Sequence, residues 1–226
     1  MQTPAERQLI TELKEIVSHN PEARLLNIGA AKSLVIEQAL YEDGRQPFHC
    51  DRLDIENSQV THPVVENCYQ ASVEAMTDVR SGFYDAAFAN YVLEHVANLS
   101  AAVLEISRIL KPGGLFVLST PNPAAPEFKL SHHTPLWFHQ LIKGEGDGKR
   151  AYETVYAYKN IADLIKIFEA HGFHCLRIMR ISFTEGYLYR FPVINVLSRI
   201  YDKVVTKLKI NFLMGNVCLV FQKINS

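Results

Sequence analysis

The sequence predicts an α/β fold in which a mostly parallel sheet carries helices on both faces. Short apolar runs indicate buried strands at residues 23–29, 84–90 and 115–120. Segments whose apolar residues recur at helical spacing follow two of these strands, at residues 30–40 and 92–110. Strands that alternate with helices are typical of right-handed β-α-β units, which build parallel sheets.

The remaining segments fit the same plan. Leu9, Leu13 and Val17 recur at helical spacing and predict an N-terminal helix that ends near Asn20. The run Lys-Pro-Gly-Gly at 111–114 stops the helix before it, because proline cannot continue a helix. The other expected elements are a strand at 47–55, a short strand or loop at 69–76, a helix at 160–171, a strand at 173–182 and a strand at 216–222.

Size and composition suit one domain that spans residues 1–226. The formal net charge of −1 gives no general attraction to nucleic acid, because that binding depends on neutralising phosphates. No transmembrane segment is expected, since no apolar stretch reaches the roughly 18 residues that a membrane span needs. The N-terminus lacks the apolar region of a signal peptide, and the four cysteines form no Cys-x-x-Cys pair, so we expect a cytoplasmic protein with reduced thiols.

Two segments differ from the regular alternation. Residues 121–155 are rich in proline and glycine, which indicates a long insertion or lid over one face of the sheet. The amphipathic helix expected at about 190–210 has apolar residues on one side and basic residues elsewhere. We interpret it as a crossover helix that packs its apolar face on the sheet; contact with a membrane surface or a lipid acceptor is the alternative.

Two residues suggest where a ligand binds. In an open α/β sheet the ligand lies outside the carboxyl ends of the strands. Gly29 closes the first strand and permits a sharp turn close to a ligand. Asp51 follows 22 residues later, near the spacing at which nucleotide-binding folds keep an acid for the ribose hydroxyls.

Several longer motifs carry a family resemblance. They are LLNIGA, the triplet Ser72-Val73-Glu74, YDAAFANYVLEHV (84–96) and ILKPGGLFVLSTPNP (109–123). With them, residues 20–180 resemble the class I S-adenosylmethionine-dependent methyltransferases, especially the small-molecule branch that includes the ubiquinone-pathway enzymes. The resemblance implies a Rossmann-like, doubly wound sheet of seven strands with the last strand antiparallel. It also implies S-adenosylmethionine as cofactor and a small-molecule acceptor.

The same resemblance implies roles for residues after the first two strands. Asn27 stands at the family's acidic position, and Gly29 and Ala30 would pack against the methionine part of the cofactor. Asp51 would hold the ribose hydroxyls, with Arg52 beside the adenine.

The resemblance also implies roles for residues that follow the later strands. Ser72, Val73 and Glu74 would border the adenine edge. Asn90 and Tyr91, at the end of a later strand, would face the methionine end and the methyl group that is transferred.

The family's glycine-rich loop is altered here. Its pattern Asp-x-Gly-x-Gly-x-Gly corresponds to Asn27, Gly29, Ala31 and Ser33, so one acid and two glycines are replaced. A Cβ at Ala31 is unfavourable if the loop needs a positive φ. A catalytically inactive binding or scaffold protein is therefore the alternative to a methyltransferase.

His95 lies in the LEHV motif and is interpreted as a packing residue.

The acceptor side is the least specified. We expect O-methylation, for which a base is useful, and His133 and His132 in the insertion are the candidates. Trp137, Phe138 and Tyr187 are candidates for an apolar acceptor pocket. The histidines lack recognisable carboxylate partners, so no metal site is expected. The acceptor is expected to be a small molecule, with a hydrophobic acceptor as a hypothesis.

Overall fold

The computed structural model describes residues 2–44, 47–126, 154–188 and 192–224. The α-helices are α1 Pro4–His19, α2 Val35–Tyr41, α3 Leu99–Ile109, α6 Ile161–Ala170, α7 Thr184–Tyr187 and α8 Pro192–Lys207, and the short 3-10 helices are η1 Leu93–His95 and η2 Asn211–Leu213. The strands are β1 Arg24–Ile28, β2 His49–Asp54, β3 Val65–Gln70, β4 Tyr84–Asn90, β5 Leu110–Pro121, β6 Phe173–Ile181 and β7 Asn216–Lys223.

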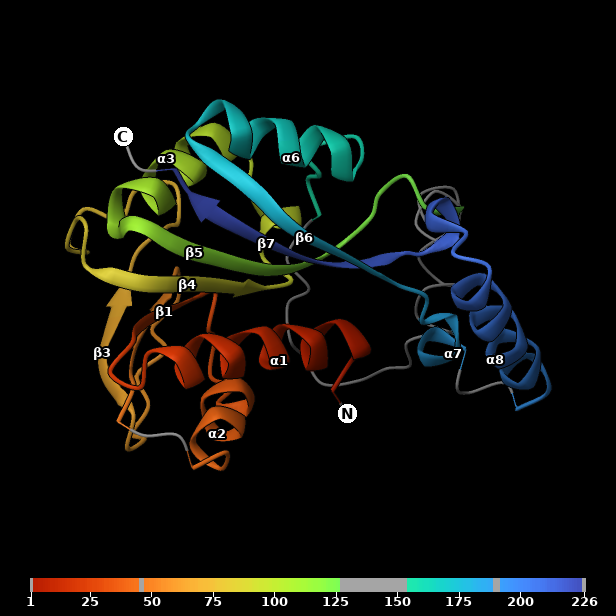
Figure 1. The fold of residues 1–226 in the computed structure, drawn as a ribbon, viewed down its shortest axis with the longest axis horizontal. Coiled ribbons are helices and arrows are strands. Elements are labelled where there is room, and N and C mark those ends of the chain that lie inside the picture. The colour runs from red at the N-terminus through yellow and green to blue at the C-terminus, as the bar shows by residue number, and fades with distance from the viewer. Residues whose placement is uncertain (1, 45–46, 127–153, 189–191, 225–226) are drawn as a thin grey trace.

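The strands form one seven-stranded sheet in the order β3-β2-β1-β4-β5-β7-β6 (Figure 1). Strands β1 to β5 pair in parallel, whereas β7 runs antiparallel to both β5 and β6. The strand order reverses between β1 and β4, which is where a doubly wound sheet opens a crevice for a ligand. The predicted fold class and the antiparallel last strand are confirmed.

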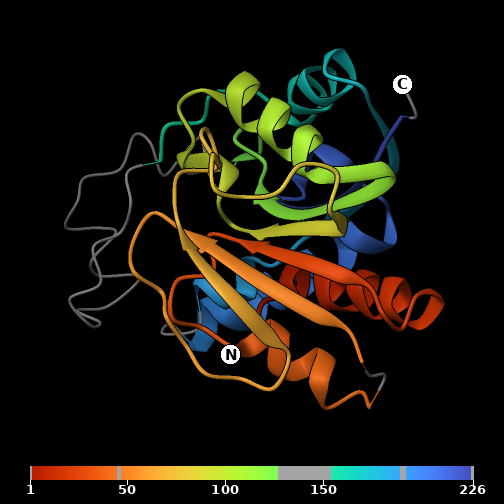
Figure 2. The same cartoon turned by 90° about the vertical axis from the view of Figure 1, so that its left-hand side faces the viewer.

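Helices cover both faces of the sheet (Figure 2). Helices α3 and α6 lie on one face, where Phe168 stacks between Phe116 and Phe221. Helices α1 and α2 lie on the other face. Successive strand residues point to opposite faces, so Leu25 packs with the α1 side and Leu26 with the α3 side. This arrangement fixes the parallel strands and leaves their carboxyl ends at one edge.

Several expected elements have different bounds, and for two of them the residues explain the difference. The helix predicted at 92–110 is interrupted after η1, and α3 starts at Leu99, because the side chain of Asn98 accepts a hydrogen bond from the amide of Ala101 and caps it. Strand β3 lies at 65–70 rather than 69–76. This strand is difficult to recognise in the sequence because it lies at the edge of the sheet and is partly exposed. It therefore lacks a continuous apolar run.

The prediction that α8 packs its apolar face on the sheet is wrong. Within residues 193–207 only Ser198, Asp202 and Val205 are buried. Asp202 faces α7 and accepts hydrogen bonds from the amides of Thr184 and Glu185. The apolar side of α8 is exposed to solvent. In the described part of the chain, no helix is both long and apolar enough to cross a bilayer.

Candidate functional site

A cavity of about 510 Å³ lies at the carboxyl ends of β1, β2 and β4. Its walls come from the loop after β1, the end of β2, the loop after β3 and the segment that follows β4. Four elements far apart in sequence therefore meet at the edge of the sheet where the strand order reverses. The volume is within the usual range of about 300–1,000 Å³ for small-molecule sites.

Gly29 forms part of the wall, and its conformation and surroundings disfavour any side chain at this position. Its φ is +71°, and a Cβ added to it would lie 2.3 Å from Cγ2 of Val92. The amide of Gly29 donates a hydrogen bond of 2.8 Å to the carbonyl of Leu53. The first turn of the site is thus held close to both β2 and the segment after β4, and a side chain at this position would push them apart.

Ala31 stands at a glycine position of the family pattern and adopts a positive φ. Its φ is +47°, which costs about 1 kcal/mol or more for a residue with a Cβ. The conformation is held by a hydrogen bond of 2.8 Å from its amide to Oδ2 of Asp54. The loop therefore keeps its left-handed turn even though the glycine is absent.

Arg52 lies beneath this loop. Its side chain is fully buried, and Nη2 donates to the carbonyl oxygens of Ala30, Ala31 and Ser33 at 2.9–3.0 Å. Nη1 forms an ion pair of 2.7 Å with Glu37, which is equally buried. Arg52 does not line the cavity, so the predicted place beside the adenine is corrected to a place under the glycine loop.

Asn27 belongs to the same buried group. Its Nδ2 donates a hydrogen bond of 2.8 Å to Oε1 of Glu37. An aspartate at this position would bring a second carboxylate against Glu37, with Arg52 as the cation bonded to that cluster. The departure from the family acid is therefore explained by Glu37. Asn27 does not line the cavity, although it was predicted to contact the cofactor.

Asp51 is also placed away from the cavity. It lies in the middle of β2, opposite Leu26 of β1, and only 3% of it is exposed. Oδ2 accepts a hydrogen bond of 2.6 Å from Tyr84, and Oδ1 accepts from the amide and side chain of Asn67. Burial and the bond to Asp51 raise the pKa of Tyr84 far above its usual range. Asp51 is a core residue, because it lies within β2, which runs on to Asp54, and not at the end of the strand as expected from its spacing to Gly29.

Asp54 occupies the position that was predicted for Asp51. It is the last residue of β2 and lines the cavity. Oδ2 accepts from the amide of Ala31, and Oδ1 accepts from the amide of Glu56 at 2.9 Å. Two backbone amides thus fix the carboxylate at the cavity wall. The signal in the sequence is that Asp54 is the last acid of the expected strand, directly before Ile55 and the polar residues 56–59.

The predicted adenine-side residues are brought together. Ser72, Val73 and Glu74 all line the cavity opposite the loop after β1. The hydroxyl of Ser72 accepts a hydrogen bond of 3.2 Å from the amide of Glu74. The carboxylate of Glu74 accepts one of 2.6 Å from the amide of Asn98 at the start of α3. The turn is therefore held in place by its own polar groups.

Tyr91 lines the cavity at the end of β4, with a positive φ of +56°. Its hydroxyl donates to Oδ1 of Asn216 at 2.8 Å and lies 3.3 Å from Oγ1 of Thr3. His95 also lines the cavity. From the sequence, His95 is interpreted as a packing residue. The structure places its ring at the wall of the cavity.

Asn90 does not line the cavity. Its Nδ2 donates a hydrogen bond of 3.1 Å to Glu6 of α1, and its Oδ1 accepts one from Ser119 of β5. Asn90 therefore ties the N-terminal helix to the sheet, and its predicted place at the methionine end of the cofactor stays a prediction.

The predicted acceptor-side residues are not described. His132, His133, Trp137 and Phe138 lie outside the described residues, and of Tyr187 only the backbone in α7 is described. Their proposed roles stay predictions.

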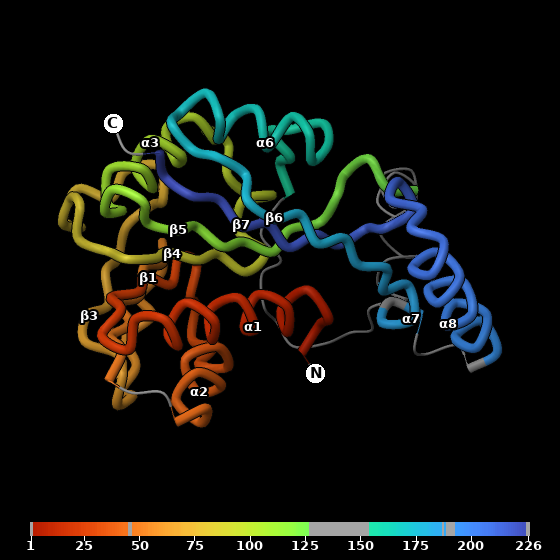
Figure 3. The backbone as a smooth tube through the Cα atoms, in the orientation of Figure 1, coloured from red at the N-terminus to blue at the C-terminus, as the bar shows by residue number. Residues whose placement is uncertain are grey.

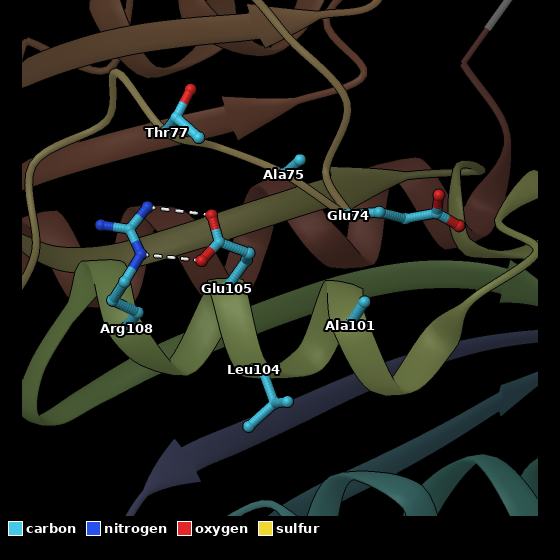
Figure 4. Close-up of a pocket in the computed structure, with 7 residues that line it drawn as sticks. All are labelled: Glu74, Ala75, Thr77, Ala101, Leu104, Glu105 and Arg108. Carbon is cyan, nitrogen blue, oxygen red and sulfur yellow. Dashed lines mark hydrogen bonds and ion pairs between the residues drawn. The ribbon is translucent and has the colours of Figure 1, made fainter.

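A second hollow, of about 580 Å³, lies on the surface between α3 and the segment at 74–77 (Figure 4). Its charged side chains bond to each other and to the backbone. Glu105 pairs with Arg108 at 2.8 Å and accepts from the amide of Met76 at 2.6 Å, while Arg108 donates to the carbonyls of Met76 and Val79. These groups hold the segment against α3, so we assign the ligand site to the first cavity.

Glu94 is a buried carboxylic acid behind the cavity. It lies in η1 with 4% exposure, and burial raises its pKa to about 7. Thr120 donates a 3.3 Å hydrogen bond to it, and the hydroxyl of Tyr158 lies 2.7 Å from that of Thr120. The raised pKa makes the stability of the fold depend on pH.

We expect Glu94→Gln to remove this dependence. Because the folded pKa of about 7 exceeds the ordinary value of 4.5, the contribution of Glu94 to stability is fully present below about pH 4.5. This contribution falls as the pH rises, and it is lost above about pH 7. Relative to the variant the loss is about 3 kcal/mol. Urea unfolding of both proteins at several pH values measures the difference. Glu22→Gln, at an exposed position, is the control, and an equal pH profile for Glu94→Gln and wild type would contradict the prediction.

Comparison with known proteins identifies the family. Residues 1–178 match the family described as "Methyltransferase domain". The chain belongs to this family. The resemblance that the motifs carry is thereby confirmed.

Curated relatives of the methyltransferase chain match part of it. The ubiquinone biosynthesis O-methyltransferase of Pectobacterium atrosepticum is 29% identical over 116 residues, which cover 48% of this chain and 46% of that protein. The demethylmenaquinone methyltransferase of Staphylococcus haemolyticus is 30% identical over 110 residues, or 46% of this chain and 45% of that protein. The matched part spans about half the length of these relatives.

Solved structures match the methyltransferase chain over most of its length. An S-adenosylmethionine dependent methyltransferase from Mesorhizobium loti covers 98% of each chain with a TM-score of 0.63 and 14% identity. Phosphoethanolamine N-methyltransferase 2 of Haemonchus contortus, in complex with S-adenosyl-L-methionine, has a TM-score of 0.59 and 14% identity, and covers 97% of this chain and 53% of that one. At these identities the likeness concerns the fold alone.

Proposed function

We propose that the chain transfers a methyl group from S-adenosylmethionine to an oxygen atom of a small, apolar acceptor. The observation that carries the proposal is the cavity itself. It lies at the strand-order reversal, with Gly29 in its wall and the carboxylate of Asp54 held at the end of β2. Lys32 is not among the residues that line it, so the altered glycine loop does not fill the space with a side chain.

The residues present fit an adenosyl cofactor. A carboxylate whose two oxygens already accept backbone amides still has lone pairs for two ribose hydroxyls, and Asp54 supplies one. Ser72, Val73 and Glu74 would border the adenine, and Gly29 with Tyr91 would lie at the methionine end. When bound, S-adenosylmethionine supplies a methyl group already activated by its sulfonium.

The main contribution of the protein is then to place the acceptor in line with that methyl group, which can supply about 7–11 kcal/mol of the barrier. A hydroxyl acceptor reacts faster when a base removes its proton. His95 lines the cavity, and its imidazole can accept a proton from a hydroxyl group. His133 and His132 remain the candidates from the insertion.

The two curated relatives support the acceptor class. One is named for ubiquinone biosynthesis and O-methylation, and the other for demethylmenaquinone. We infer a quinone-related ring compound as acceptor, with transfer to oxygen as in the first of these names.

The experiment has two readouts. Calorimetry with S-adenosylmethionine measures cofactor binding, and mass spectrometry of a panel of hydroxylated quinones and amines detects the gain of one methyl group. Binding together with methylation of a quinone hydroxyl supports the proposal. Binding without methylation of any compound, or no binding, favours the alternative of an inactive binding or scaffold protein, to which the replaced loop glycines Ala31 and Ser33 point. Methylation of an amine alone would overturn the O-methyl assignment.

A further inference from the structure

Helix α8 presents a continuous apolar stripe to solvent. Its members recur at helical spacing, and each is between 47% and 77% exposed: Val193, Val196, Leu197, Ile200, Val204 and Leu208. The adjoining η2 adds Phe212, which is 68% exposed. Soluble proteins rarely leave a contiguous apolar surface of this kind uncovered unless it meets a partner or a membrane.

The opposite side of α8 already has a packing partner. Ser198 and Asp202 are buried there, and Asp202 accepts hydrogen bonds from the amides that start α7. This contact with α7 fixes the rotation of α8 about its own axis. The apolar stripe therefore faces solvent in the folded chain.

Basic residues flank the stripe on one side. At 100° per residue, Arg199, Lys203 and Lys207 follow the edge of the apolar arc. Between residues 193 and 222 the sequence has these three, Lys209 and a single acid, Asp202, which is buried against α7. Glu185 of α7 is a further acid beside these basic residues, and it forms an ion pair of 2.9 Å with Arg199. The face that reaches solvent is therefore apolar with a positive margin.

The stripe lies at the edge of the sheet where the cavity opens. Asn216, the first residue of β7, is paired with both Pro121 at the end of β5 and Ile181 at the end of β6. The segment between β6 and β7, which contains α8, consequently projects from the carboxyl-end edge (Figure 3).

We propose that α8 and η2 bind the surface of an anionic lipid bilayer. The apolar stripe enters the boundary between head groups and acyl chains, while Lys203 and Lys207 contact the lipid phosphates. An amphipathic helix with a basic polar margin binds in this way, lying in the plane of the interface. A second copy of the chain is a less suitable occupant, because symmetric pairing would bring the basic margins of two α8 helices together with no free carboxylate on α8 to balance them.

The test is sedimentation of the purified chain with vesicles of phosphatidylcholine, with and without phosphatidylglycerol. We expect binding to the anionic vesicles at low salt and weaker binding at high salt. Leu197→Glu should lower the affinity at least about tenfold, and Lys203→Gln about fivefold. The controls are Leu104→Glu on α3, whose leucine is 56% exposed, and Lys166→Gln on α6, an exposed lysine. Both should bind like the wild type.

Three results would overturn the proposal. The wild type could fail to bind anionic vesicles, or Leu197→Glu could bind as well as the wild type. A dimer by light scattering that Leu197→Glu converts to a monomer, with no vesicle binding, would assign the stripe to a second copy. Circular dichroism establishes that each variant is folded. None of these readouts depends on S-adenosylmethionine, so they stand apart from the proposed function.

Discussion

Replacing Asp54 by asparagine should lower the affinity for S-adenosylmethionine by about 100-fold to 10,000-fold. Hydrogen bonds to a charged group contribute about 1.5–3 kcal/mol each, and the ribose has two hydroxyls to bond. Asp54 is the carboxylate that the structure places at the cavity, at the end of β2. Calorimetry with S-adenosylmethionine or its demethylated product measures the change.

Asp51→Asn is the matched control, three residues away on the same strand. Asp51 is 3% exposed and bonds to Tyr84 and Asn67. Its replacement should lower the melting temperature and leave the cofactor affinity nearly unchanged. If Asp51→Asn abolishes binding in a folded protein while Asp54→Asn binds normally, the ribose role returns to Asp51.

A second ligand separates the ribose contact from the loop. Asp54 also accepts the amides of Ala31 and Glu56, so its replacement could weaken binding by moving the loop. A cofactor analogue without the 2′ and 3′ hydroxyls removes the ribose contact alone. The wild type should prefer the natural ligand strongly, and Asp54→Asn should show little preference. An undiminished preference in the variant would show that Asp54 does not bond the ribose.

The sequence predicts the buried centre of the fold well, because burial leaves a mark on composition. β4 and β7 are nearly continuous apolar runs, and their bounds are recovered within about a residue. β3 escapes detection since its side chains are partly exposed, as expected for an edge strand with mixed residues. The apolar face of α8 shows a further limit. Amphipathic spacing predicts that one side of a helix is apolar. It does not predict whether that side packs against the rest of this chain or against another molecule.

At the site, the sequence locates segments more reliably than atoms. Gly29, Ser72 and Glu74 line the cavity, and the roles in cofactor binding that the resemblance implies for them stay predictions. Asp51 and Asp54 are both acids on β2, and only the register of the strand tells which one reaches its end. Contacts across long sequence separations, such as Arg52 with Glu37, have no local signal.

The buried pair of Arg52 and Glu37 gives the largest expected effect on stability. Both side chains are completely buried and their atoms lie 2.7 Å apart. Arg52→Met leaves the carboxylate of Glu37 unpaired in the core, which should lower the free energy of unfolding by about 3–5 kcal/mol. Urea unfolding measures the loss. Lys14→Met, which breaks the more exposed ion pair with Asp43, is the control and should cost no more than about 1 kcal/mol.

The double variant Glu37→Leu with Arg52→Met separates the two roles of the arginine. With both charges gone, no charge is left unpaired, so much of the lost stability should return. Cofactor affinity should stay low, because the carbonyls of Ala30, Ala31 and Ser33 still lack the donor that holds the loop. Recovery of both properties together would show that Arg52 only balances Glu37. A single Arg52→Met variant as stable as the wild type would show that the pair is not buried as described.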